Sequence, residues 1–190
     1  MKRAEIIARR REFVIPRYKR KYKTLADVGF DGEWVTPYQM VSNSETGPVL
    51  VAHYWLDAQS VHEHRDVLME EGWLPGMPFN NVLSQALDRV NLTRPEIYVT
   101  QAFHLLPYKQ WPPFPTPHVD ESFDRITRHE CAGRTVIALG TVAQRACRRA
   151  GVEAIECISP SAPGMTYEAK ARELATALKA ALARIGSDSG

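Results

Sequence analysis

The chain has 190 residues, 44% of them hydrophobic, and a formal net charge of +2, which suits one folded domain with a core. No apolar run reaches the roughly 18–20 residues of a membrane-spanning helix, and the N-terminus lacks the apolar segment of a secretory signal. The three cysteines, Cys131, Cys147 and Cys157, are widely separated. We therefore expect neither disulfides nor a zinc ribbon, and a reduced, cytoplasmic location.

The charge is unevenly distributed along the chain. Residues 1–23 contain ten basic and two acidic residues, a net charge of +8, which leaves −6 for residues 24–190. We divide the chain accordingly into a basic N-terminal arm and a single α/β domain. A basic arm attracts the phosphate backbone of nucleic acids, and Arg9, Arg10 and Arg11 are its candidate DNA contacts. A solvated helix followed by a basic linker would have the same composition.

Apolar periodicity and turn residues predict the following elements in chain order: a helix at 3–13, a turn-rich segment at 24–48, a strand at 49–55, helices at 60–71 and 80–90, a strand at 96–100, a helix at 120–132, a strand at 135–139, a helix at 141–150, a strand at 153–158 and a helix at 167–185. Ser60 is the expected N-cap of the second helix and Gly72 its stop. Four strands alternating with helices predict right-handed crossovers. The expected fold is three-layer α/β/α with a central four-stranded parallel sheet.

Three strand-then-loop units in the second half, at 95–107, 134–151 and 152–164, indicate where a site should lie. In an open parallel sheet, ligands bind where the carboxyl ends of strands meet such loops. The usual nucleotide fingerprints are absent: the chain has neither GxGxxG after its first strand nor GxxxxGKS/T. It also lacks the GxSxG motif of a hydrolase nucleophile.

Five segments within residues 34–180 resemble the uracil-DNA glycosylase superfamily in order and spacing. They read VLVAHYWLD, MPFNNVLSQAL, IYVTQAF, VIALGTVA and CISPSAPG. Pro78-Phe79 before a helix and the segment from Leu139 to Ala143 match the family's pattern most closely. The resemblance implies a glycosylase-like fold that hydrolyses the N-glycosidic bond of uracil, or a related damaged base, in DNA. It also implies an abasic product and no metal or cofactor.

The chain departs from the family's pattern at the positions of the family's catalytic and base-reading residues. His53 stands where the family's first loop begins with Gly, and Tyr54-Trp55 stand where it carries a water-positioning acid or amide. Gln101 stands at the position of the base-reading Asn. Ser159 replaces the His of the family's His-Pro-Ser loop.

The resemblance nevertheless assigns roles to residues of this chain. Phe79 is expected to stack on the extruded base and Gln101 to read its edge. Asp57, the nearest carboxylate, is expected to position water or to stabilise a sugar cation. His104, just past the second strand, is the expected substitute for the missing loop histidine.

Further residues are expected to shape the pocket and contact DNA. Tyr54 or Trp55 would form a wall of the base pocket, and Ser159 and Ser161 would donate to a DNA phosphate. The loop 107–118 mixes aromatic and basic groups, which suits a DNA-facing wall. Each of these assignments has an ordinary alternative, as a core aromatic, a strand-end amide, a loop acid or a turn serine. No metal site is expected.

Two other classes of function stay open. One is a non-catalytic DNA-binding or abasic-site-binding protein of the same fold. The other is an unrelated α/β enzyme that processes nucleosides or nucleotides, because a fold does not fix a function. For the glycosylase and for the non-catalytic binder, we expect a monomer without membrane association. Its partner would be DNA that contains uracil or abasic sites.

Overall fold

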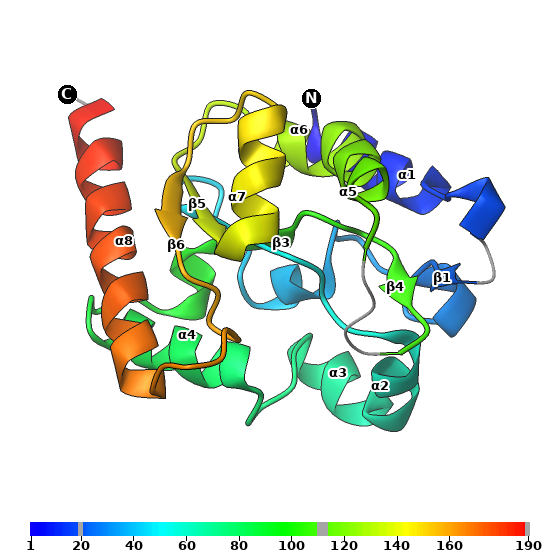
Figure 1. The fold of residues 1–190 in the computed structure, drawn as a ribbon, viewed down its shortest axis with the longest axis horizontal. Helices are drawn as coiled ribbons and strands as arrows, with labels where there is room; N and C mark the ends of the chain where they lie inside the picture. Colours follow the sequence, from blue (N-terminus) through cyan, green and yellow to red (C-terminus); the bar gives the residue numbers. More distant parts are fainter. Residues whose placement is uncertain (19–20, 110–113, 189–190) are drawn as a thin grey trace.

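A four-stranded parallel sheet forms the centre of the computed structural model, which describes residues 1–18, 21–109 and 114–188 (Figure 1). The strand order is β3-β2-β5-β6. The strands are β2 (Val49–Ala52), β3 (Tyr98–Gln101), β5 (Val136–Leu139) and β6 (Ile155–Cys157). The predicted three-layer α/β architecture with its parallel sheet is confirmed.

The strands are short, and three of the four are buried on both faces, whereas β6 at the edge of the sheet is partly exposed. All four residues of β2 are buried, as are those of β3 and β5, which is typical of parallel strands covered by helices on both sides. The expected strand at 49–55 is too long. Pairing continues beyond β2 only through Ala102 N–H to Ala52 O and Phe103 N–H to His53 O, after which the chain leaves the sheet.

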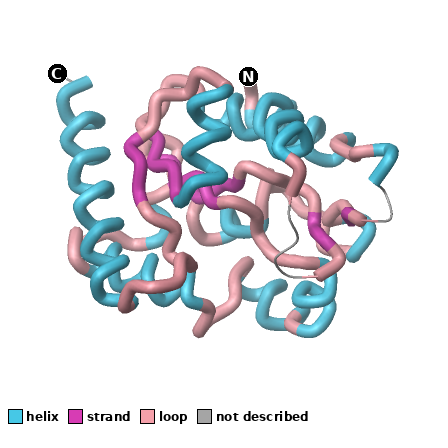
Figure 2. The backbone as a smooth tube through the Cα atoms, in the orientation of Figure 1, coloured by secondary structure: helices cyan, strands magenta, loops and turns pink. Residues whose placement is uncertain are grey.

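Alternate strand residues face two separate apolar cores. Leu50 and Ala52 belong to one cluster, with residues of α4 (Pro78–Asp88) and α8 (Tyr167–Asp188). Val49 and Val51 belong to the other, with residues of α7 (Gly140–Arg149). This alternation follows from the two-residue period of a strand. Figure 2 shows the strands gathered between these helices.

The remaining helices differ from the sequence prediction mainly at their ends. The polar helix is divided into α2 (Ala58–Glu63) and α3 (Arg65–Glu71), and Gly72 ends it in a left-handed conformation as expected. A continuous helical stretch replaces the one expected at 120–132. It is made of α5 (Thr116–Ser122), a π-helical segment (Phe123–Thr127) and α6 (Arg128–Cys131). Short 3-10 helices cover Pro16–Tyr18, Ala26–Val28, Pro37–Met40 and Arg94–Glu96.

The N-terminal arm packs onto the body of the protein. Its helix, α1 (Arg3–Glu12), lies against the π-helical segment and α6, and buries Ile6 and Ile7. Phe13 is fully buried in the same core. Beyond the helix, β1 (Tyr22–Lys23) pairs antiparallel with β4 (Leu106–Pro107), a small sheet that the sequence did not predict. Two-residue strands of this kind depend on tertiary contacts rather than on local pattern.

Within the described ranges, no helix combines the length and apolar character required to cross a membrane.

Candidate functional site

A pocket of about 170 Å³ lies at the carboxyl ends of the central strands. Its walls come from the β2 end and following loop (residues 52–57), Tyr38, the start of α4 (residues 77–79), Leu139 and the loop after β6. This is the edge where open parallel sheets bind ligands. The structure therefore brings together Tyr54, Asp57, Phe79, Ser159 and Ser161 from three separate segments of the chain.

A wider hollow of about 700 Å³ lies at the opposite edge, around the starts of β5 and β6. Its most buried cation, Arg134, is already engaged, since Nη2 donates to Ser44 O at 2.6 Å and to Gly47 O at 2.9 Å. The sequence-predicted site residues do not line it. The carboxyl-edge pocket is therefore the candidate site.

Phe79 and Tyr38 form one aromatic side of the pocket. Pro78 begins α4, where its fixed φ is favourable and its missing N–H costs no helical hydrogen bond. Phe79 follows directly, and its ring centroid lies 5.5 Å from that of Tyr38 at a tilt of 35°. Burial raises the pKa of Tyr38, so its hydroxyl stays neutral. Phe79 serves the core and the pocket at once.

Tyr54 and Trp55 both line the pocket, with different anchors. The Trp55 indole N–H donates to Gly72 O at 3.2 Å, and its ring packs on Phe30 in the core. Tyr54 packs on Phe114, with ring centroids 5.1 Å apart. Phe114 belongs to the loop 107–118, so this loop contacts the pocket wall through Tyr54. Residues 110–113 of the loop, including Trp111, lie outside the described residues.

Asp57, rather than the expected Ser60, is the N-cap of α2. Its carboxylate accepts a hydrogen bond from Ser60 N–H at 3.0 Å and from Ser60 Oγ–H at 2.6 Å. The side chain is buried, with 2% exposure, and borders the pocket. A carboxylate has about four acceptor positions, so capping leaves capacity to bind a water or a substrate group.

The loop after β6 supplies the two serines. Its turn is closed by Ala162 N–H donating to Ser159 O at 2.9 Å, and Ser161 N–H donates to Ser159 Oγ at 3.3 Å. Gly140 packs against this loop, and a Cβ added to Gly140 would lie 2.8 Å from the Cβ of Ser159. The close approach of the β5–α7 turn fixes this wall of the pocket.

Gln101 and His104 do not line the pocket. Gln101 is 2% exposed, and its Oε1 accepts a hydrogen bond from Thr36 Oγ–H at 2.9 Å. His104 is also 2% exposed, with Nε2 lying 3.0 Å from Thr127 Oγ1. Because Thr127 Oγ–H already donates to Gln101 O, Nε2 of His104 must carry the proton of their shared hydrogen bond. Burial lowers the pKa of His104 to about 3, so the ring is neutral.

Both residues adjoin a buried polar network centred on Glu130. Its carboxylate accepts hydrogen bonds from Tyr98 Oη–H at 2.6 Å, from Thr100 Oγ–H, and from Gln39 Nε2–H at 2.9 Å. Burial raises the pKa of Glu130, and the three donors act in the opposite direction. The network connects α6 to β3 and to the 3-10 helix Pro37–Met40, and it has a structural role.

His53 lines the pocket, although the family resemblance gave it no role. It follows β2 directly, and its ring meets those of Phe114 and Tyr54 edge-on, at centroid distances of 4.8 and 5.0 Å. Burial lowers its pKa to about 4. Its Nε2 is buried and has no hydrogen-bond partner among the described residues. Its position one residue past the first strand of the parallel sheet is the sequence feature that could have identified it as a pocket residue.

The three arginines predicted to contact DNA have different surroundings. Arg10 is only 4% exposed and pairs with Asp31, while donating to the carbonyl oxygens of Gly32 and Trp34. Its guanidinium belongs to the interior, so the expectation of a DNA contact is wrong for this fold. Arg11 is exposed but paired with two carboxylates, since Nε lies 3.0 Å from Asp31 Oδ2 and Nη2 lies 2.9 Å from Glu33 Oε1.

Arg9 is exposed and lies 3.2 Å from Nε2 of His129. Among the described residues, no three His, Cys, Asp or Glu side chains are grouped as metal ligands would be.

Comparison of the chain with protein-family models and with curated proteins found no match. The fold and site define the class of protein: an α/β domain with a small aromatic and polar pocket at the carboxyl edge of its parallel sheet. The pocket is therefore the feature of the molecule from which a function can be inferred.

Proposed function

We propose that this protein hydrolyses the N-glycosidic bond of uracil, or of a related damaged base, in DNA and leaves an abasic site. The observation that supports the proposal is the convergence of Tyr54, Asp57, Phe79, Ser159 and Ser161 on one pocket. These are five of the residues to which the family resemblance gives a role at the base, the sugar or the phosphate.

The size and lining of the pocket favour a single-ring base. A cavity of roughly 150 Å³ is known to hold benzene, and this pocket measures about 170 Å³. Drug-sized ligands take roughly 300–1,000 Å³. Phe79 and Tyr54 supply aromatic surface for stacking, which an extruded base requires.

Asp57 is the candidate for the chemical step. Cleavage adds the hydroxyl of water to C1′ of the sugar, while the base leaves with the bonding electrons and then takes up a proton. A carboxylate can orient that water and stabilise positive charge on the sugar. The N-cap contacts to Ser60 fix the orientation of Asp57 before the substrate arrives.

A non-catalytic binder of uracil or abasic DNA is the second candidate. Both carboxylate oxygens of Asp57 already accept hydrogen bonds from Ser60, which gives this side chain a structural role without catalysis. His104, the expected substitute for the missing histidine, is buried outside the pocket. These two observations favour binding without cleavage.

The deciding experiment uses a labelled uracil-containing oligonucleotide, single- and double-stranded, in EDTA, followed by alkali to cut abasic sites. A matched oligonucleotide with thymine in place of uracil is the control. We expect uracil-dependent cleavage that Asp57→Asn abolishes. Retarded migration of uracil or abasic DNA without cleavage would instead establish the binder. Neither cleavage nor binding would overturn both candidates.

A further inference from the structure

We propose that the imidazole of His53 forms the hydrogen bond that identifies the bound base, a task that the sequence resemblance gave to Gln101. This inference rests on the proposed function for the identity of the ligand. It assigns His53 as a specificity-determining residue, and its ligand as a neutral pyrimidine that carries a carbonyl beside a ring N–H.

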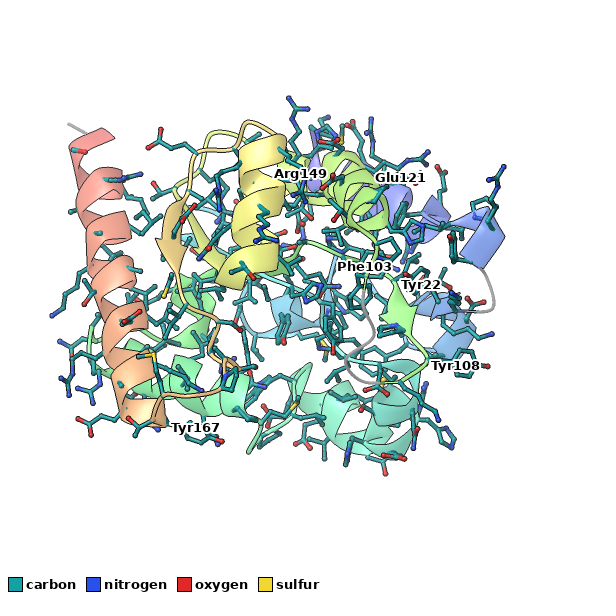
Figure 3. The ribbon with its side chains drawn as sticks, viewed as in Figure 1. Tyr22, Phe103, Tyr108, Glu121, Arg149 and Tyr167 are labelled. Atoms are coloured by element: carbon teal, nitrogen blue, oxygen red, sulfur yellow. The ribbon has the colours of Figure 1, made fainter. Side chains whose placement is uncertain are left out.

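The backbone and the neighbouring rings both restrain His53. The carbonyl oxygen of His53 accepts a hydrogen bond from Phe103 N–H at 2.9 Å, which ties the residue to the segment after β3. Its ring meets Phe114 at an interplanar angle of 73° and Tyr54 at 90°. Phe103 in turn packs on Phe114 and on Tyr22, and Figure 3 labels Tyr22 and Phe103 beside each other. The imidazole is therefore positioned before a ligand binds.

One of the two nitrogens of this ring is left unused by the described residues. Nε2 is buried without a hydrogen-bond partner among the described residues. Buried polar atoms in native proteins are almost always paired, so an orphan beside a pocket calls for an explanation. A base with an alternating pattern of carbonyl and N–H groups would supply the missing partner.

The protonation state suits a neutral ligand. Burial lowers the pKa of His53 to about 4, and no charged group among the described residues opposes this effect. At neutral pH the ring then has one N–H donor and one bare nitrogen acceptor. The other candidate reader, Gln101, has its Oε1 occupied by Thr36 and does not reach the pocket lining.

The test combines NMR with two substitutions. The imidazole nitrogens of the intact protein are observed by long-range ¹H–¹⁵N correlation during titration with free uracil, cytosine and thymine. We expect uracil to shift the His53 nitrogens and to leave those of His104 unchanged. His53→Phe keeps an aromatic ring but removes both nitrogens, and it should weaken uracil binding roughly tenfold.

His53→Gln, which retains an amide donor and acceptor, should recover part of the affinity. His62→Gln, at an exposed position on α2, is the matched control and should bind as the wild type does. Thermal unfolding of each variant separates lost recognition from lost folding.

The outcomes distinguish this inference from the proposed function. If no free base shifts the His53 nitrogens, or if His53→Phe binds and excises uracil as the wild type does, the role of His53 is overturned. If uracil shifts them but DNA is never cleaved, recognition by His53 stands and glycosylase activity falls.

Discussion

Gly140 and Ser159 approach each other so closely that a Cβ added to Gly140 would lie 2.8 Å from the Cβ of Ser159. Gly140 also has a φ of +81°, a conformation that residues with a side chain rarely adopt. Because Ser159 lines the pocket, this glycine determines where one pocket wall lies. The relationship joins the turn after β5 to the loop after β6.

We therefore expect Gly140→Ala to displace the Ser159 loop as well as to strain the backbone. Gly151→Ala is the matched control, because Gly151 has a φ of +68° but no atom of the described residues lies within 4 Å of an added Cβ. Both variants should lose roughly 1–2 kcal/mol through backbone strain. Only Gly140→Ala should also weaken uracil binding or excision, by about tenfold or more. Urea denaturation and the oligonucleotide assay measure the two effects, and equal activity in both variants would contradict this account.

Two substitutions of Asp57 can separate its role as the N-cap of α2 from the role of its negative charge. Asn caps helices about as well as Asp, so Asp57→Asn should change stability by less than about 0.5 kcal/mol, whereas Asp57→Ala should cost about 1 kcal/mol. Both variants lose the negative charge, so both should lose uracil excision. Chemical denaturation and excision rates provide the comparison. Excision by Asp57→Asn at the wild-type rate would remove the carboxylate from the mechanism.

Two neutral imidazoles make the fold sensitive to acid. The pKa is lowered to about 3 for His104 and to about 4 for His53, against about 6.5 in an unfolded chain. The unfolded state therefore binds protons more readily, and the stability these groups contribute is present above pH 6.5. It is lost as pH falls from about 6.5 towards 4, by about 1.4 kcal/mol per pH unit for each imidazole.

Urea denaturation at several pH values between 7.5 and 4.5 measures this slope. His104→Gln keeps an amide N–H for Thr127 but cannot titrate, so it should flatten the slope by about 1.4 kcal/mol per pH unit. An unchanged slope would show that folding does not lower the pKa of His104.

The packing of α1 changes how the DNA role of the N-terminal arm should be tested. Deleting residues 1–23 would remove Phe13, Tyr22 and three isoleucines from the core, so loss of binding could reflect unfolding. Lys21 and Lys23 flank Tyr22, whose ring stacks on Phe114 beside the pocket, at a centroid distance of 6.1 Å.

We expect Lys21→Gln with Lys23→Gln to weaken binding of single-stranded uracil DNA. Two lost phosphate contacts should reduce the slope of log affinity against log salt by about 1.4. The control is Lys2→Gln with Arg3→Gln, which removes two exposed charges from the start of α1. Fluorescence anisotropy at several salt concentrations measures the DNA affinity of both double variants. Equal slopes for the two variants would show that DNA does not contact Lys21 and Lys23.

Sequence patterns alone predict the parallel sheet and the edge at which the candidate site lies. Short β-branched runs and helical periodicity are local properties, so they identify the strands and the helices between them. The rule that ligands bind at the carboxyl ends of parallel strands then predicts that Phe79, Asp57 and Ser159 lie close together there. The same reasoning could not show that β1 pairs with β4, because two-residue strands carry no pattern of their own.

The packing of distant segments selects the polar groups that are free to bind a ligand. Arg10 is occupied by Asp31, Gln101 by Thr36, and His104 by Thr127. Each pair joins segments far apart in the chain, and a buried polar group takes whichever partner the packing of those segments provides. Within the described ranges, the same packing leaves Nε2 of His53 without a hydrogen-bond partner, which no local pattern could indicate.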